Sequence, residues 1–261
     1  MVQLTAENLS LAYDGADVVR ELSMAIPPRQ ISALIGANGS GKSTLLKGLA
    51  RVMKPKAGAV YLDCQAIHRL PTRQVARQLA VLPQRPEAPE GLTVRELAAF
   101  GRFPHQGFLG AFTAEDDRQI DRALEITGIV ELADRPLGEL SGGQRQLAWI
   151  AMALAQDTRL LLLDEPTTFL DMAHQIEVLE VLRRLHGDGG RTIVMVLHDI
   201  NQAARYAQHM IALVAGRIAH SGTPREMLTP AVLADVFGIE AEVFVDSRSG
   251  APFCIPLGLS R

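Results

Sequence analysis

The chain has 261 residues, a formal net charge of −3, and 48% hydrophobic and 21% charged residues. This length fits one large domain or two small ones, and the composition excludes a mainly disordered or fibrous protein. A net charge of −3 provides no global positive field for nucleic acid or an anionic membrane surface, so we expect no nucleic-acid partner.

The sequence shows no signal for secretion or membrane insertion. No basic start with an apolar run behind it occupies residues 1–10, and no apolar stretch approaches the roughly 18 to 20 residues of a spanning helix. We therefore expect a soluble protein, or one that reaches a membrane only through a partner. Cys64 and Cys254 lack metal-binding spacing, which favours two buried or semi-buried thiols.

The first fifth of the chain predicts strands, then a glycine-rich loop and a helix. Apolar residues alternate loosely over 2–11, and two short apolar runs at 21–26 and 30–35 are separated by two prolines. Prolines at that point end one strand before the next begins. The second run is followed at once by glycine, and a helix-compatible stretch covers 42–52.

The glycine-rich loop matches the pattern G-x-x-x-x-G-K-[ST]. Its nine residues are Gly36, Ala37, Asn38, Gly39, Ser40, Gly41, Lys42, Ser43 and Thr44. Glycines let backbone N–H groups turn onto phosphate oxygens, and the following helix points its positive end at the same anion. We expect Lys42 to reach the β and γ phosphates and the Ser43 hydroxyl to coordinate Mg²⁺. A plain glycine-rich turn is the alternative, but the preceding strand and following helix are the context that the motif requires.

The middle of the chain, from about residue 85 to 157, predicts an inserted helical block. Segments 93–100, 113–127 and 144–155 all have helical periodicity. Thr113 with Asp116 resembles a capping signal, and Gly128 stops the second helix.

Strands and helices then alternate, which predicts a parallel α/β sheet. The four leucines at 160–163 suit a strand covered on both faces, and 192–197 is a second buried strand. Asp171 and Asp199 can each cap the helix that follows a strand. The first of these helices should end at Gly187 and bury one apolar stripe, made of Ile176, Leu179, Leu182 and Leu185.

Two adjacent carboxylates, Asp164 and Glu165, end the four-leucine strand. Ligands of parallel sheets bind at the carboxyl ends of the strands, so we expect the pair beside the phosphate loop. Asp164 suits Mg²⁺, normally through a water, and Glu165 is then left to polarise the attacking water as a general base. The alternative is an acidic strand end followed by a turn at Pro166.

His198 and Gln84 also come directly after predicted strands. His198 could hydrogen-bond the γ-phosphate or hold the water, and a histidine satisfied within the core is the alternative. Gln84 is a neutral amide that could contact Mg²⁺ and the water, with a surface loop glutamine as the alternative.

Residues 140–144 read Leu-Ser-Gly-Gly-Gln and open the predicted helix at 144–155. A serine and two glycines there make a second phosphate-binding helix start, and one γ-phosphate does not need two such sites on one chain. The segment resembles the signature motif of ABC ATPases, and the resemblance covers nearly the whole chain. The phosphate loop, Gln84, the signature, the acid pair and His198 occur in the order that this family has.

The resemblance implies an α/β fold: a P-loop NTPase (RecA-like) core with a parallel sheet, N-terminal antiparallel strands and an inserted helical subdomain. It implies an ABC ATP-binding domain over residues 1–231. The core of that domain would comprise 1–84 and 159–231, and the helical subdomain 85–158. Residues 232–261 would form a C-terminal extension, packed on the core or following it.

The resemblance also implies how ATP is held. Tyr13 would stack on the adenine ring. The ATP of one copy would be closed by the signature of a second copy, giving a head-to-tail dimer around two nucleotides, with Asp171 in the loop at the dimer contact. The signature residues that would act in this way are Ser141, Gly142, Gly143 and Gln144.

Several segments look like the ATPase subunits of ferric-siderophore importers, namely 101–107, 148–156, 165–174, 196–206 and the tail 222–256. This implies Mg²⁺-dependent ATP hydrolysis coupled to transmembrane permease subunits and, indirectly, to a periplasmic or extracellular substrate-binding protein. The chain would sit peripherally on the cytoplasmic face of the inner (cell) membrane. Helices near Gln84 to Phe100 would form a groove for a short permease helix.

Other interpretations stay open at this point. Importers of vitamin B12 or haem are close relatives, and a soluble ABC ATPase that remodels an assembly partner would share these motifs. DNA-repair and ribosome-associated members fit poorly, because the chain has one cassette and only short helices in the insertion. A simple P-loop kinase would not need the signature. Leu147 departs from the family, in which most members carry arginine; it is either a tolerated helix position or a source of weaker communication from the signature helix.

Overall fold

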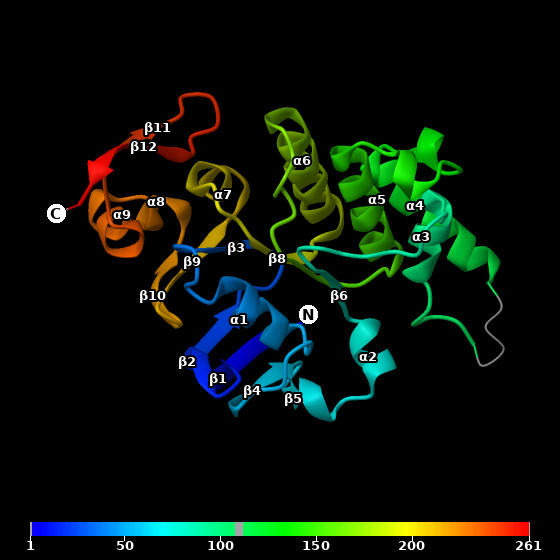
Figure 1. Ribbon diagram of the computed structural model, residues 1–261, viewed down its shortest axis with the longest axis horizontal. Coiled ribbons are helices and arrows are strands. Elements are labelled where there is room, and N and C mark those ends of the chain that lie inside the picture. The colour runs from blue at the N-terminus through cyan, green and yellow to red at the C-terminus, as the bar shows by residue number, and fades with distance from the viewer. Residues whose placement is uncertain (1, 108–111, 261) are drawn as a thin grey trace. The chain divides into compact units, whose positions relative to one another are not determined.

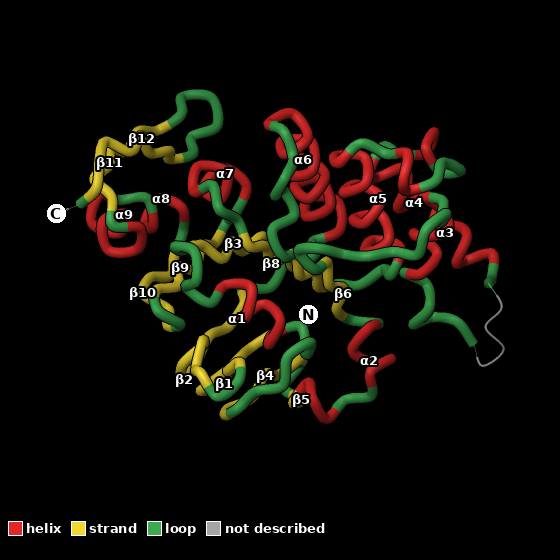
Figure 2. The backbone as a smooth tube through the Cα atoms, in the orientation of Figure 1, coloured by secondary structure: helices red, strands yellow, loops and turns green. Residues whose placement is uncertain are grey.

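The computed structural model describes residues 2–107 and 112–260. The chain forms two compact units, one made of Met1–Arg69 with Thr192–Arg261 and the other of Leu70–Arg191. Figure 1 labels the helices and strands of each unit, and Figure 2 colours them by type. No helix in the described part of the chain is long and apolar enough to cross a bilayer.

The first unit carries most of the strands. Its elements are β1 (Leu4–Tyr13), β2 (Ala16–Ile26), β3 (Ile31–Ile35), α1 (Lys42–Leu49), β4 (Ala57–Leu62), β5 (Gln65–Ala66), a 3₁₀ turn (Ile67–Arg69), β8 (Thr192–Val196), α7 (Ile200–Tyr206), β9 (His209–Val214), β10 (Arg217–Gly222), α8 (Pro224–Met227), α9 (Pro230–Phe237), β11 (Ile239–Val245) and β12 (Pro252–Leu259).

Two sheets organise this unit. The antiparallel N-terminal sheet has the order β2-β1-β4-β5, which confirms the N-terminal antiparallel strands expected from the resemblance. In the other sheet β3 pairs in parallel with both β8 and β9, and β10 closes the edge antiparallel to β9. Every residue of β3 and β8 is buried, including Ser32 and Thr192, as expected for strands covered on both faces.

The C-terminal hairpin of β11 and β12 packs on α9 around Leu233, Ala241 and Cys254. The Asn201 side chain fastens it to the start of α7, since its amide donates to the Cys254 carbonyl at 3.0 Å and accepts the Cys254 N–H at 2.8 Å. Cys254 is buried as predicted, whereas Cys64 is exposed, so the prediction of two covered thiols is wrong for Cys64. Cys64 lies with Asp63 in the tight turn between β4 and β5, where both residues have positive φ.

The second unit is mainly helical. Its elements are α2 (Thr72–Ala76), β6 (Leu79–Leu82), α3 (Val94–Phe100), α4 (Ala114–Thr127), two 3₁₀ turns (Val130–Leu132 and Leu137–Glu139), α5 (Gly142–Ala155), β7 (Leu160–Leu163) and α6 (Met172–Gly189). β6 pairs with β7 in parallel, and all four leucines of β7 are buried, as their unbroken apolar run predicts.

Capping residues set where these helices begin. Thr113 and Asp116 form the expected capping box at α4, and Gly128 ends that helix with φ 71°. α5 begins at Gly142, two residues earlier than predicted, because Ser141 caps it. α6 begins after Asp171 but runs past Gly187, because the left-handed C-cap is Gly190.

The sequence-based prediction for the buried face of α6 is wrong in one residue, and the predicted domain boundaries stay untested. Ile176 is 45% exposed, so the predicted apolar stripe of α6 does not begin there; its buried face is formed by Val178, Leu179, Val181, Leu182 and Leu185. The division into a core of 1–84 and 159–231, a helical subdomain of 85–158 and an extension of 232–261 stays a prediction. Residues 108–111 of the helical block lie outside the described residues.

Candidate functional site

The loop from Gly36 to Thr44 joins β3 to α1 and depends on glycine geometry. Gly36, Gly39 and Gly41 have φ of 141°, 78° and 101°, which L side chains rarely adopt. A Cβ at Gly36 would lie 2.3 Å from the Leu213 carbonyl oxygen, so that position accepts only glycine. Gly39 by contrast borders open space.

Cationic and hydroxyl groups line the same loop. Lys42 is 5% exposed, and its Nζ donates to the carbonyl oxygens of Gly36 at 2.9 Å and Ala37 at 3.0 Å. Among the described residues, the buried Ser40 Oγ has no hydrogen-bond partner. A buried hydroxyl without a partner costs free energy until it binds one. A buried ammonium, an unsatisfied hydroxyl and the start of the eight-residue helix α1 therefore suit a phosphate group.

Two other predicted residues belong to this first unit. Leu34 of β3 is in register with Val196 of β8, and Gly36 and His198 each come two positions after that pair. The two residues thus leave neighbouring parallel strands at the same edge of the sheet, as predicted. Tyr13 is the last residue of β1 and is 46% exposed, so its ring is available to stack on a ligand.

In the second unit, Gln84 and Glu165 have the same relationship to their strands. Leu82 of β6 pairs with Leu163 of β7, and Gln84 and Glu165 each lie two positions beyond. Gln84 Nε2 donates to Glu165 Oε2 at 2.5 Å, and Thr168 Oγ1 donates to the same oxygen at 2.9 Å. Two donors on one carboxylate oxygen fix its position.

The acid pair itself is buried. Asp164 and Glu165 are 3% and 9% exposed, and the Asp164 N–H donates to the Leu82 carbonyl at 2.9 Å. Glu165 has φ 52°, an uncommon left-handed conformation for a side chain of its size. A strained backbone that holds a buried carboxylate is a common property of reactive sites.

Ser141 caps α5 through a reciprocal pair of hydrogen bonds with Gln144. The Gln144 N–H donates to Ser141 Oγ at 3.2 Å, and the Ser141 N–H donates to Gln144 Oε1 at 3.1 Å. Because the Ser141 hydroxyl accepts in this pair, its own hydrogen can be donated to an anion. Both Ser141 and Gly142 are exposed, as contact with a ligand requires.

Gly143 is in close contact with α6. A Cβ there would lie 2.0 Å from His174 Cδ2, so the His174 ring occupies the space of a side chain. The His174 N–H and Nδ1 both lie within hydrogen-bond distance of Asp171 Oδ1, at 2.9 and 2.8 Å. The backbone and side-chain hydrogen bonds from His174 lower the pKa of the Asp171 carboxyl. Asp171 thus positions the ring that a Cβ at residue 143 would displace.

The predicted site residues are divided between the two units. The phosphate loop, Tyr13 and His198 belong to the first, and Gln84, the signature, the acid pair and Asp171 belong to the second. Their assembly into one site stays a prediction. Sequence reasoning missed Thr168 and His174, although each lies three residues after a singled-out acid, a spacing that suits a local side-chain contact.

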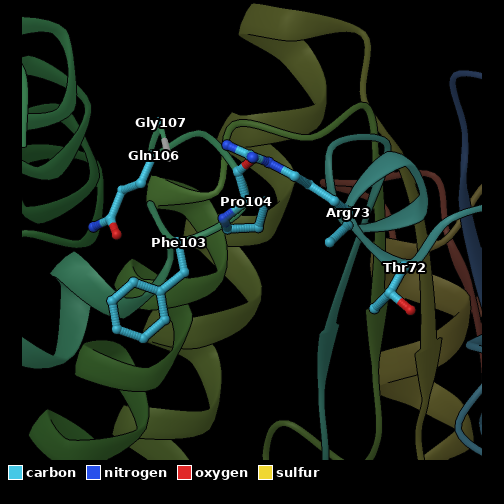
Figure 3. A pocket seen from close by; sticks show the side chains of 7 residues that line it. Thr72, Arg73, Phe103, Pro104, Gln106 and Gly107 are labelled. Carbon is cyan, nitrogen blue, oxygen red and sulfur yellow. The ribbon is translucent and has the colours of Figure 1, made fainter. Parts of the chain in front are cut away.

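A cavity of about 430 Å³ lies in the second unit beside α2. Figure 3 shows the Arg73 side chain extending from α2 toward Pro104, whose carbonyl accepts hydrogen bonds from the Nε atoms of Arg73 and Arg77, both at 2.8 Å. Phe103 lines the cavity and is 55% exposed.

Comparisons with known proteins agree with this geometry. Residues 19–168 match the family model described as ABC transporter. The chain is 52% identical to the iron(3+)-hydroxamate import ATP-binding protein FhuC of Bacillus subtilis (strain 168), covering 100% of this chain and 97% of that protein. It is 49% identical to the achromobactin transport ATP-binding protein CbrD of Dickeya dadantii (strain 3937), with the same coverage.

Solved structures give the same result. A protein assigned to the metal-chelate type of ABC transporter, in an inward-facing conformation, aligns with TM-score 0.84 and 29% identity over 98% of this chain and 97% of that chain. The ATP-binding cassette MJ0796, a dimer in a post-hydrolysis state bound to ADP and Pi, aligns with TM-score 0.74 and 26% identity, over 84% of this chain and 98% of that chain. The glycine loop suits a phosphate group, and the family match covers more than half of the chain. This chain therefore belongs to the ABC transporter family and is an ATP-hydrolysing cassette.

Proposed function

We propose that this chain is the ATP-hydrolysing subunit of an importer for ferric siderophores, and that two copies close around two ATP molecules. The relatives named for iron(3+)-hydroxamate and achromobactin transport support this cargo class, because each aligns with the whole chain at about half identity. Vitamin B12 and haem remain the alternative cargoes. The observation that carries the catalytic part of the proposal is the fixed contact between Gln84 and Glu165.

The phosphate loop would hold ATP through its backbone N–H groups from Gly36 to Thr44. Lys42 would move part of its hydrogen bonding from the loop carbonyls to the β and γ phosphates. Ser40 Oγ would gain the partner that it lacks among the described residues. Tyr13 would stack on the adenine ring, as its exposed ring at the end of β1 permits.

Oxygen donors of this chain fit Mg²⁺, which neutralises phosphate charge when it is bound with ATP. We assign the Ser43 hydroxyl, the Gln84 amide and the Asp164 carboxylate to the ion. The described residues contain no group of three or more His, Cys, Asp or Glu side chains that could hold a metal. One carboxylate with neutral oxygens suits Mg²⁺, which is usually held by few protein carboxylates together with substrate phosphates and waters.

Glu165 would act as the general base toward water. Gln84 and Thr168 hold its Oε2, which fixes the direction of the carboxylate toward the attacking water. General-base assistance is typically worth about 10² to 10⁴ in rate. His198, from the first unit, would hydrogen-bond the γ-phosphate or the water.

The second copy would complete each site with the α5 start. The Ser141 hydroxyl and the Gly143 N–H, with Gly142 and Gln144, would contact the γ-phosphate of the partner's ATP. Asp171 would support this contact through His174, whose ring packs against Gly143. The dimeric ADP-bound cassette described above supports this arrangement.

We place the permease contact at the cavity beside α2 (Figure 3) rather than at the groove near Gln84 to Phe100 that the resemblance implies. Phe103 offers an apolar contact. The Nε atoms of Arg73 and Arg77 bind the Pro104 carbonyl, and their Nη atoms offer further hydrogen-bond donors. A short permease helix with an apolar residue and a nearby acid fits this chemistry. The chain would thereby sit on the cytoplasmic face of the cell membrane, and a substrate-binding protein would deliver cargo to the other face.

Replacement of Glu165 with Gln tests the catalytic assignment. We expect ATP binding to persist, turnover to fall about 10² to 10⁴-fold and dimers to accumulate with ATP, as measured by nucleotide binding, phosphate release and light scattering. The matched control is Glu131→Gln, an exposed glutamate of the same unit, which should change none of these. A monomeric Glu165→Gln protein with full turnover would refute both the base and the dimer.

Purification with the native permease tests the transport role. An importer subunit should be recovered with a polytopic partner only in detergent, and Arg73→Glu should weaken that recovery while Arg118→Glu should not. Uptake assays in vesicles with ferric siderophores, vitamin B12 and haem then decide the cargo. Recovery of a soluble partner without detergent would instead support an assembly-remodelling ATPase.

A further inference from the structure

Glu165 and Phe169 begin and end a short turn that follows β7. Both residues have left-handed backbone conformations, with φ of 52° and 65°. Thr168 closes the turn from inside, because its N–H donates to the Glu165 carbonyl at 3.2 Å and its Oγ1 donates to Glu165 Oε2 at 2.9 Å. The direction of the Glu165 carboxylate therefore depends on the conformation of the whole turn.

The conformation of Phe169 is unfavourable, and burial does not offset it. A left-handed backbone is costly for any residue with a Cβ, and bulky side chains seldom adopt it. The Phe169 side chain is nevertheless 77% exposed, so it gains little from removing apolar surface from water. Backbone conformations of this kind concentrate at functional sites, where the surrounding contacts hold them.

Arg85 contacts the exposed ring of Phe169. Its guanidinium carbon lies 5.7 Å from the ring centroid, within the range of a cation–π interaction. Arg85 directly follows Gln84, whose Nε2 donates to Glu165 Oε2 at 2.5 Å. The segment after β6 and the turn after β7 are thus joined twice, by the hydrogen bond on the carboxylate and by the Arg85–Phe169 pair at the end of the turn.

We propose that Arg85 and Phe169 are positioning residues for ATP hydrolysis, because their contact holds the segment after β6 where the Gln84 amide reaches Glu165. The pair supplies no reacting group and acts through Gln84. Without the contact, Glu165 adopts a wider range of orientations, and fewer of them suit proton transfer from the attacking water. This inference rests on the proposed role of Glu165 as the general base.

ATP turnover by the full chain tests this assignment, with kcat and KM determined separately from phosphate release. Phe169→Leu keeps an apolar side chain but removes the π face, and Arg85→Gln removes the cation. We expect each to lower kcat about two- to fivefold at an unchanged KM for ATP, which is the strength of an exposed cation–π contact expressed as a rate. Phe169→Trp and Arg85→Lys retain the interaction and should keep kcat near the wild-type value.

The matched controls are Phe112→Leu and Arg118→Gln, which alter an exposed phenylalanine and an exposed arginine of the same unit. Both should leave kcat unchanged. If the pair acts as one contact, Phe169→Leu combined with Arg85→Gln should lower kcat no further than either change alone. Because the pair acts through Gln84, Phe169→Leu should also have no further effect in a Gln84→Ala background.

Three results would overturn the proposal. These are an unchanged kcat in Phe169→Leu and Arg85→Gln, additive losses in the double variant, and a loss in Phe169→Trp as large as that in Phe169→Leu. Thermal unfolding shows which variants are folded, and the exposed Arg85 supplies the test even if a change at Phe169 disrupts the turn. Failure of the proposed function looks different, because Glu165→Gln would then retain full turnover. Failure of this inference alone leaves Glu165→Gln inactive and the Arg85 and Phe169 variants at the wild-type kcat.

Discussion

Arg102 Nε lies 2.8 Å from Asp116 Oδ1, and both side chains are only 4% exposed. Arg102 Nη1 also donates to the Ala155 carbonyl at 2.7 Å. One guanidinium thus joins the end of α3, the start of α4 and the end of α5. We expect Asp116→Asn to cost about 3 to 5 kcal/mol of unfolding free energy, because a buried arginine is left without its counter-charge. Urea unfolding followed by circular dichroism measures this.

The control for that change is Glu115→Gln, which removes an exposed ion pair with Arg118 one position earlier. We expect no measurable change in the unfolding midpoint, because solvent screens exposed pairs. Equal effects of the two substitutions would mean that the Arg102 contact is not a buried ion pair.

The same pair predicts a dependence of stability on pH. Burial by itself raises the pKa of the Asp116 carboxyl, but hydrogen bonds from Arg102 and Thr113 outweigh it and lower the pKa from 3.8 to about 2. The stabilisation is therefore fully present above pH 3.8 and is lost as pH falls through about 2. The difference in stability between wild type and Asp116→Asn should shrink over this interval. A constant difference down to pH 2 would contradict the lowered pKa.

Two glycines of the phosphate loop should respond differently to alanine. At Gly36 the new Cβ would lie 2.3 Å from the Leu213 carbonyl oxygen, so we expect Gly36→Ala to disrupt the loop and abolish nucleotide binding. At Gly39 no atom lies within 4 Å of the Cβ position. Gly39→Ala should therefore cost only the backbone strain of a left-handed residue, roughly 1 to 2 kcal/mol. Thermal unfolding and nucleotide titration compare the two, and equal losses would refute the steric argument.

Gly143 and His174 should show strong coupling. Gly143→Ala would force the His174 ring away from Asp171, because the Cβ would lie 2.0 Å from His174 Cδ2. We expect Gly143→Ala to destabilise the chain more in the wild-type background than in His174→Ala, where the space is vacant. A double-mutant cycle on the unfolding midpoint measures the coupling energy. Additive effects would show that the ring is not the obstacle.

Leu147 is 2% exposed and packs within the helical unit. We expect Leu147→Met to cost less than about 1.5 kcal/mol, because volume and apolarity are kept. Leu147→Arg, which introduces the residue of most family members, should cost more, since its guanidinium must leave the apolar contact surface to reach water. Urea unfolding of both variants tests this, and a Leu147→Arg variant as stable as wild type would show that the site reaches solvent.

Local backbone structure was predictable from the sequence where the residue type itself restricts the conformation. The glycines of the phosphate loop predict a backbone that side chains would block, Thr113 and Asp116 predict a helix start, and the leucines of β7 predict a strand buried on both faces. The position of Gln84 and Glu165 at the ends of neighbouring strands followed in the same way, since parallel strands bring their carboxyl ends to one edge, but their direct hydrogen bond was not predicted.

Other features depend on contacts that sequence spacing does not encode. Ile176 fits a helical apolar stripe, yet it is exposed because the buried face of α6 is set by what packs against it. Gly187 looks like a helix stop, but glycine ends a helix only where the chain turns left-handed, and that happens at Gly190. The buried salt bridge of Arg102 joins residues whose separation in sequence carries no signal.

The two thiols differ in a way that makes the unaltered chain suitable for spectroscopy. Burial raises the pKa of the Cys254 thiol, and Asn201 holds its backbone in place, whereas Cys64 is exposed in a tight turn. A maleimide spin label should therefore react at Cys64 alone, since exposed thiolates react first. A dimer would carry one label per copy, and the distance between the two labels would report nucleotide-driven closure without any engineered cysteine.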